Sequence, residues 1–172
     1  MATKNEPRKF KATGLQMLWP NLSGAEGQYN RAGDRNFNLL LVGAPELEKQ
    51  LKREGWNVKY TKPRDEEDIE EAFLPVAVNY DSMRKPRVYL LTSKGKQLLP
   101  EDLVGSLDYM DIEYVDVEVN PYVWSVNGNS GVKAYLEVMF VKQSESELEQ
   151  LYSDVPDADE VVTEHVSEDE EF

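Results

Sequence analysis

IEYVDVEVNPYVWSVNGNSGVKAYLEVMFVK, residues 112–142, contains the strongest β-hairpin signal of this chain. Apolar and polar residues alternate over 112–119 and again on both sides of Asn127-Gly-Asn-Ser130. Alternation with a period of two is typical of a strand with one buried face, and Asn-Gly between two such runs is a strong signature of a tight turn. The segment therefore predicts a pair of antiparallel strands.

The length of the turn decides which side chains share a face of this hairpin. A four-residue loop over 127–130 places Trp124 opposite Lys133 and Tyr122 opposite Tyr135, so that three rings and one cation form a single surface. The other face then carries small apolar residues suited to a core, namely Val123, Val132, Ala134 and Leu136. A loop one residue longer or shorter reverses the faces, and Tyr122 and Trp124 are then core aromatics.

The rest of the first 144 residues alternates short apolar segments with turn residues. We expect strands over residues 15–19, 37–42, 56–62, 73–80 and 87–92, a Gly- and Asn-rich loop over 20–36, and a helical turn over 100–107. A helix is predicted over 45–55, with Pro45 in its first turn, acids before bases, and Gly55 at its end. This pattern favours a mainly β fold, a small and strongly bent antiparallel sheet or barrel with one or two short helices.

The charge of the chain is divided unevenly. The sequence has 172 residues, with 33 Asp and Glu, 19 Lys and Arg, and a formal net charge of −14. Residues 145–172 hold twelve of the acids and none of the bases, so residues 1–144 carry 21 acids and 19 bases, a net charge of −2. We therefore predict a globular domain over 1–144 and a disordered acidic tail over 145–172, which buries too little apolar surface to fold.

The composition excludes several classes of site. There is no cysteine, which rules out disulfides, thiolate zinc sites and a cysteine nucleophile. The single histidine, His165, lies in the tail, and no glycine-rich phosphate loop occurs, so we predict no metal and no cofactor. No apolar run approaches the roughly 20 residues of a membrane helix, and no signal peptide follows Met1. We expect a cytoplasmic protein whose mature chain begins at Met1.

Aromatic and basic residues also occur together outside the hairpin, over 56–62 and over 80–89. Proteins that bind single-stranded nucleic acid need flat rings on which bases stack and cations along the path of the phosphates. The N-terminal segment adds Arg8, Lys9 and Lys11, either as phosphate contacts or as part of a solvated terminus. The first 144 residues thus contain both kinds of group that such binding needs.

Carboxylates suggest a different function. Mg²⁺-dependent phosphodiester cleavage needs two or more carboxylates that converge on a metal ion, and Asp111 with Glu113 are the candidates for a nuclease or resolvase. The acids over 111–118 divide between two strand faces, and residues 65–68 are typical of a solvated loop, so we predict binding and no enzyme activity. A third hypothesis is an acidic protein that mimics DNA, which the near balance of charges over 1–144 disfavours.

Several of these segments resemble bacteriophage single-stranded DNA-binding proteins with an oligonucleotide-binding (OB) fold. The resemblance rests on residues 57–62, 73–78, 87–91 and 120–136, and on the acidic tail that ends in Glu168-Asp-Glu-Glu-Phe172. It extends over most of residues 37–172. Residues 1–36 match no pattern that we recognise, and the tail departs from the family pattern at Val161-Val-Thr163 and His165-Val-Ser167.

The resemblance implies an OB-fold domain that coats single-stranded DNA without strong sequence preference in phage DNA replication, recombination and repair. It also implies a tail that recruits replication or recombination proteins and competes with DNA for the basic groove. The tail residues in this role are Glu168, Asp169, Glu170, Glu171 and Phe172. A tail that only improves solubility is the alternative.

We assign candidate DNA contacts by residue type. The stacking candidates are Tyr60, Tyr89, Tyr122, Trp124 and Tyr135. The phosphate candidates are Lys59, Lys62, Arg84, Lys85, Arg87 and Lys133. A homodimer through an edge strand or through the loop over 20–36 is compatible with the sequence.

Overall fold

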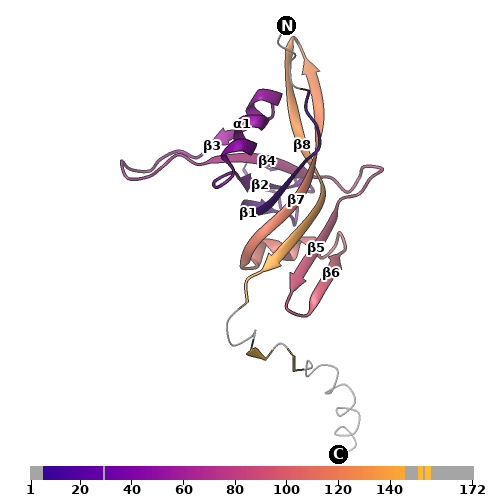
Figure 1. Ribbon diagram of the computed structural model, residues 1–172. Helices are drawn as coiled ribbons and strands as arrows, with labels where there is room; N and C mark the ends of the chain where they lie inside the picture. Colours follow the sequence, from indigo (N-terminus) through magenta and orange to yellow (C-terminus); the bar gives the residue numbers. More distant parts are fainter. Residues whose placement is uncertain (1–5, 29, 146–150, 153, 156–172) are drawn as a thin grey trace, which may run out of the picture.

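The computed structural model describes residues 6–28, 30–145, 151–152 and 154–155, which are arranged around one β-barrel (Figure 1). In chain order the elements are β1 (Phe10–Asn21), β2 (Arg35–Leu40), α1 (Pro45–Glu54), β3 (Lys59–Tyr60), β4 (Ala72–Val78), β5 (Arg87–Thr92), β6 (Gly95–Leu99), η1 (Val104–Tyr109), β7 (Ile112–Val126) and β8 (Asn129–Gln143). The prediction of a mainly β protein with short helices is confirmed.

Five strands close the barrel in the order β1-β2-β4-β8-β7. β1 pairs antiparallel with β2 and β7, β2 with β4, and β7 with β8. A short parallel pairing, of Val76 with Ala134 and of Ala77 with Tyr135, closes the barrel between β4 and β8. The five-stranded barrel confirms the predicted OB-like fold. Its parallel closure joins segments far apart in the chain, so it leaves no local signal in the sequence.

Alternate residues of the barrel strands fill its interior. Phe37 and Leu39 of β2, Leu74 of β4, and Val115 and Val119 of β7 have no exposed surface. Burying a side chain of this size stabilises the fold by about 1.5–3 kcal/mol. The residues between these inward positions form the outer surface on which the candidate site is built.

β5 and β6 form a ribbon that extends the sheet past the barrel (Figure 1). β5 runs parallel to β8, from Arg87 opposite Val138 to Leu91 opposite Lys142, and β6 pairs antiparallel with β5. The strand predicted over 87–92 is therefore present. β6 is absent from the sequence-based expectation because Gly95 and the two polar residues after it interrupt the apolar alternation.

Helix α1 ends where its sequence predicts. Gly55 follows it in the left-handed conformation, with φ 88°. The next residue, Trp56, is buried, donates a hydrogen bond from Nε1 to Glu54 at 2.9 Å, and forms a backbone bridge with Val132 of β8. The strand predicted over 56–62 is reduced to Lys59–Tyr60, because Trp56 packs against the hairpin instead of pairing in a long strand.

β7 and β8 are joined by a two-residue turn. Asn127 and Gly128 have φ values of 52° and 82°, and two positive φ angles are what a type I′ hairpin turn requires. Val126 consequently pairs with Asn129. The four-residue loop predicted over 127–130 is wrong, because the Asn-Gly pair alone reverses the chain.

The shorter turn changes the pairing of the hairpin but keeps its faces. Trp124 lies opposite Gly131, and Tyr122 lies opposite Lys133. Each partner differs from the predicted one by two residues, and a shift of two preserves the face on which a side chain lies. The prediction of Val123 as a core residue is wrong: Val123 is 62% exposed, because this end of the hairpin extends past the barrel (Figure 1).

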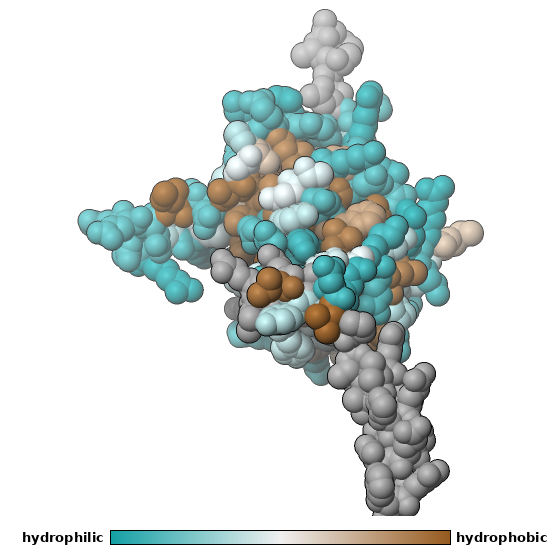
Figure 2. All heavy atoms as spheres, turned by 60° about the horizontal axis from the view of Figure 1, so that its bottom comes forward, coloured by the Kyte–Doolittle hydropathy of each residue, from teal (hydrophilic) through white to brown (hydrophobic). Residues whose placement is uncertain are grey.

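The connection between β3 and β4, residues 61–71, projects as a largely hydrophilic arm on the left of Figures 1 and 2. Its carboxylates bind its own backbone. Asp65 accepts hydrogen bonds from the N–H groups of Glu67 at 2.9 Å and Asp68 at 3.0 Å, and Asp68 accepts one from Arg64 at 2.8 Å. These exposed acids form a solvated loop, as predicted.

Candidate nucleic-acid interface

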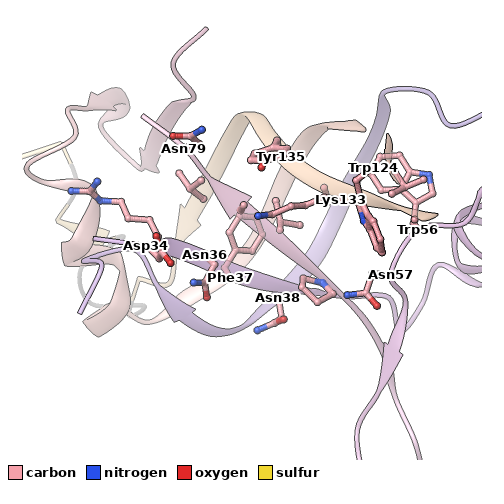
Figure 3. Close-up of a pocket in the computed structure, with 18 of the residues that line it drawn as sticks. Asp34, Asn36, Phe37, Asn38, Trp56, Asn57, Asn79, Trp124, Lys133 and Tyr135 are labelled. Atoms are coloured by element: carbon pink, nitrogen blue, oxygen red, sulfur yellow. The ribbon is translucent and has the colours of Figure 1, made fainter. Parts of the chain in front are cut away.

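A groove of about 830 Å³ crosses the outer face of the barrel beside the β7–β8 hairpin (Figure 3). Its lining comes from the loop before β2, from β2 and β4, from the segment after α1, and from the hairpin. The lining residues labelled in Figure 3 are Asp34, Asn36, Phe37, Asn38, Trp56, Asn57, Asn79, Trp124, Lys133 and Tyr135. The groove thus joins segments from both halves of the chain.

Neutral amides are a main feature of this lining, which includes Asn30, Asn36, Asn38, Asn57 and Asn79. The two on β2 alternate with buried residues and therefore face outward. Asn36 Nδ2 donates a hydrogen bond to Asn30 Oδ1 at 2.8 Å, which orients both amides. An amide side chain both donates and accepts, so such groups suit the edges of any base. The sequence-based prediction missed these residues, although the alternation over 35–40 places the asparagines on the outer face.

Trp124 lines the groove from the hairpin and rests on a glycine. A Cβ added to Gly131, its cross-strand partner, would lie 2.7 Å from Cζ2 of the indole. The ring therefore lies directly against the glycine backbone, a contact that a larger residue would disturb. Trp124 is still 38% exposed, so the ring offers accessible surface on which a base can stack.

Two tyrosines and a lysine continue this aromatic surface. The rings of Tyr122 and Tyr135 meet edge to face, with centroids 6.1 Å apart. Lys133 Nζ lies 5.2 Å from the centre of the Tyr135 ring, and within the described ranges it has no carboxylate at salt-bridge distance. The structure thus brings together four predicted residues, which we call the hairpin surface: Tyr122, Trp124, Lys133 and Tyr135. Tyr122 is the one of these four that does not line the groove itself.

The arginines of the groove lie beside acids or rings. Arg31 is paired with Asp34 at 3.6 Å. Arg35 is paired with Glu101 at 3.2 Å, and its guanidinium lies 5.3 Å from the centre of the Tyr80 ring. Burial raises the pKa of the Tyr80 hydroxyl above its usual value. This end of the groove therefore has less unpaired positive charge than the hairpin surface.

The candidates of β3 point in two directions. The Tyr60 hydroxyl accepts a hydrogen bond from Lys52 at 2.7 Å and donates one to Glu48 at 2.9 Å, and the Lys52 ammonium lies 5.2 Å from the ring centre. The bond with Tyr60 raises the pKa of Lys52. Tyr60 is therefore bound to α1, outside the groove. Lys59 faces the opposite side of the strand, and Lys62 is exposed at the start of the arm.

Tyr89 lies on β5, outside the groove. Its ring stacks on Phe140 of β8 with centroids 4.8 Å apart and planes 10° apart, and Lys96 Nζ of β6 lies 5.1 Å from its centre. β5 lies between β8 and β6, so the Tyr89 ring has one of these neighbours on each adjacent strand. The structure does not bring Tyr89 to the hairpin surface.

Arg84, Lys85 and Arg87 lie around the connection from β4 to β5, and none of them lines the groove. Arg84 is paired with Glu137 at 3.9 Å, and Lys9 also forms an ion pair with Glu137. The hydrogen bond from Lys9 holds the pKa of Glu137 below its usual value. Lys85 and Arg87 are exposed, so they are accessible to a ligand outside the groove.

The predicted tail contacts Glu168, Asp169, Glu170, Glu171 and Phe172 lie outside the described residues. At the start of the tail, Glu145 accepts a hydrogen bond from the Ser93 N–H at 2.7 Å, which lowers the pKa of Glu145. Among the residues that the structure describes, no group of three or more His, Cys, Asp or Glu residues is placed to hold a metal ion. In the same part of the chain, no helix has the length and apolar character that crossing a membrane requires.

Comparisons with known proteins place the whole chain in a family. A family model described as a putative phage ssDNA-binding domain matches residues 2–172, including the N-terminal segment for which the sequence showed no counterpart. No curated protein matches the sequence.

Solved structures of a protein from bacteriophage Enc34 have a similar fold. The single-stranded DNA-binding protein from bacteriophage Enc34 in complex with ssDNA matches with a TM-score of 0.57 and 11% identity, over 80% of this chain and 88% of that chain. A C-terminal truncation of that protein matches with a TM-score of 0.55 and 12% identity, over 80% and 87% of the two chains. At such low identity the likeness shows a common fold.

Proposed function

The chain belongs to the family of putative phage ssDNA-binding domains, and from this premise we propose that it binds single-stranded DNA in the groove beside the hairpin. The observation that carries the proposal is the hairpin surface, where exposed rings and an unpaired ammonium lie next to a row of amides. OB folds bind oligonucleotides on their second and third barrel strands and on the flanking loops. In this barrel, those positions correspond to β2, β4, the loop before β2, and the hairpin.

Each residue of the hairpin surface has a distinct role in this proposal. Trp124 stacks on one base. Tyr135, together with Tyr122, stacks on the next base. Lys133 binds a phosphate. Stacking is worth about 1–3 kcal/mol per base and tolerates any base, because every base has a π-face. The protein therefore binds without strong sequence preference, and the asparagines bond to base edges without selecting one.

The remaining candidates divide by their position relative to the groove. Tyr60 and Tyr89 take no part in stacking, because neither lines the groove. The Tyr60 hydroxyl is bound by Lys52 and Glu48 of α1, and the Tyr89 ring stacks on Phe140. The exposed cations outside the groove contact phosphates of a strand that continues past it: Lys59, Lys62, Lys85 and Arg87. Arg84 joins them when it leaves Glu137.

The acidic tail competes with DNA for the groove and recruits other proteins. Its acids resemble the charges of a phosphate backbone, and its attachment to the domain gives it a high effective concentration at the groove. Phe172 supplies an apolar anchor and the terminal carboxylate for a partner's pocket. With these parts the protein coats single strands in the host cytoplasm during phage DNA replication, recombination and repair.

We propose no catalytic role for the carboxylates of β7. Asp116 accepts a hydrogen bond from the Gly14 N–H at 2.8 Å, and Glu118 is paired with Lys11 at 3.4 Å, so both acids hold β1 against β7. The nuclease alternative predicts Mg²⁺-dependent DNA cleavage that is lost in Asp111→Asn. The DNA-mimic alternative predicts no affinity for DNA even without the tail.

Tryptophan fluorescence tests the proposal directly. We would titrate the full-length protein and a variant ending at Ser144 with oligo-dT and with duplex DNA. Quenching by the single strand alone, and tighter binding by the shorter variant, are expected. Lys133→Gln should reduce the slope of log K against log salt by about 0.7, the value for one phosphate contact on a single strand.

Two results would contradict parts of this proposal. Absence of binding to oligo-dT by both proteins would refute the groove as a DNA site. Equal affinity of the full-length and shortened proteins would refute the competition by the tail, while leaving the groove intact.

A further inference from the structure

Trp19, near the end of β1, presents a large apolar ring to solvent. It is 61% exposed, against 38% for Trp124 and 4% for Trp56. Its backbone has φ 45°, a conformation uncommon for any residue other than glycine. Its ring meets Phe73 of β4 edge to face, with centroids 5.3 Å apart and planes at 89°. The exposed ring is thus held in a defined position on the barrel surface.

Phe73 and the groove belong to the same row of outward positions on β4. Leu74 and Val76 are buried in the barrel, so Phe73 and Pro75 lie on the outer face of the strand. Pro75 lines the groove. Phe73 lies two residues further along, about 7 Å at the usual rise of a strand. The pair of Trp19 and Phe73 therefore adjoins one end of the groove.

Lys59 adds a positive charge beside this aromatic pair. It is paired with Phe73 across β3 and β4, and paired residues share a face of the sheet. Asn57, two residues earlier, lines the groove, so this segment leads from the groove toward Lys59. Lys59 is exposed, and no carboxylate in the described part of the chain lies within salt-bridge distance of it.

We propose that Trp19, Phe73 and Lys59 form a second nucleotide subsite, which holds a single strand of DNA where it leaves the groove past Pro75. Trp19 stacks on a base, Phe73 supports the indole from below, and Lys59 binds a phosphate. These are the two kinds of contact on which single-strand binding depends. This inference rests on the proposed function. It extends that function to Trp19 and Phe73, which the sequence-based prediction treats only as strand residues, and gives a place to Lys59, which is already a predicted phosphate contact.

Oligonucleotides of different length distinguish binding at this subsite from binding in the groove. One OB fold covers about 4–16 nucleotides. A strand near the lower limit is held by the hairpin surface without reaching Trp19, whereas one near the upper limit extends to it. Competition by the tail lowers the affinity for both strands by the same factor, so it cancels in the ratio of the two affinities.

The first test uses the full-length protein with oligo-dT of about 5 and about 16 nucleotides. Trp19→Ala should weaken binding of the longer strand by about fivefold or more and of the shorter strand by less than about twofold, since one stacked base is lost. Trp124→Ala should weaken both. Tyr109→Ala is the matched control, because Tyr109 is an 87% exposed aromatic residue on η1. This variant should bind both strands like the wild type.

A second test does not remove an aromatic ring. In Trp124→Phe, Trp19 is the exposed tryptophan and Trp56 is buried, so quenching reports contact at Trp19. The longer strand should quench this variant and the shorter one should not. Lys59→Gln should lower the salt slope by about 0.7 for the longer strand alone, whereas Lys49→Gln on α1 should leave it unchanged.

Different outcomes refute different claims. Unchanged binding of the longer strand by Trp19→Ala, or an equal loss for both lengths, overturns the subsite, as does absence of quenching in Trp124→Phe. If Trp124→Ala weakens binding and Trp19→Ala does not, the groove stands and only the subsite fails. If the wild type binds neither strand, both proposals fail.

Discussion

The hairpin and the strands β3 and β5 carry the same combination of aromatic and basic residues, yet only the hairpin brings its rings to the groove. Exposure does not make the difference, because Tyr60 is 39% exposed and Trp124 is 38% exposed. Tyr60 is bound by two charged residues of α1, and Tyr89 lies between Phe140 and Lys96. Trp124 instead contacts a glycine and faces the groove. Alternating rings and cations in the sequence thus identify candidate contacts, whereas the arrangement of the elements decides which of those rings line the groove.

Replacing the tryptophan that lines the groove should have the largest effect. Trp124→Ala should weaken binding of oligo-dT by about 5- to 150-fold, because one stacked base is worth about 1–3 kcal/mol. Tyr60→Ala and Tyr89→Ala should change the affinity by less than about twofold, because their rings do not contact DNA. Fluorescence anisotropy of a labelled oligonucleotide measures all three. Equal losses in the three variants would contradict the distinction between rings that line the groove and rings that lie outside it.

The glycine beneath Trp124 offers a second way to test the comparison. In Gly131→Ala the added Cβ would lie 2.7 Å from the indole, so the ring must move away from the groove position. We expect affinity for oligo-dT to fall about three- to tenfold, within the energy of one stacked base, with little change in melting temperature, because the ring is at the surface. Asn129→Ala, two residues away on the same strand and outside the groove lining, should behave like the wild type. Wild-type affinity in Gly131→Ala would show that the position of the ring does not matter.

The smallest expected effect concerns Glu137, which lies between the two regions on β8. Lys9 and Arg84 hold the pKa of Glu137 below its usual value. A carboxylate with a lowered pKa in the folded state stabilises the fold above its usual pKa, and this contribution is lost as the pH falls through the lowered value. The melting temperature of the wild type should therefore exceed that of Glu137→Gln at pH 7, and the difference should shrink below about pH 4.5.

Thermal unfolding between pH 3 and 7 gives this comparison, with Glu113→Gln as the exposed control. A constant difference between wild type and Glu137→Gln across this range would contradict the role of the ion pairs.

Local sequence signals predicted those elements that depend on near neighbours. Helix α1 has its proline and its terminal glycine at the expected places, since both act through backbone conformation at one residue. The Asn-Gly pair predicted a turn, but the number of residues in the loop was wrong because the sequence beside it also has turn character. The two-residue error preserved the faces of the strands, so Tyr122, Trp124, Lys133 and Tyr135 share one face despite the wrong register.

Local sequence signals did not predict the interactions between distant segments. The pairing of β4 with β8, which closes the barrel, joins Val76 to Ala134 through backbone groups that every residue has. Trp19 is a strand residue by its sequence, and only its contact with Phe73 places it on the outer surface near the groove. The asparagines of the groove come from four separate segments, so their convergence is also a tertiary property.

The sequence alone determined that this protein has a β domain with a nearly balanced charge and an acidic tail, because composition and alternation are properties of each segment. It also determined that rings and cations are abundant in that domain. Which of them form a surface depends on the folded chain, because a ring adjoins the groove only where elements from distant parts of the chain meet beside it.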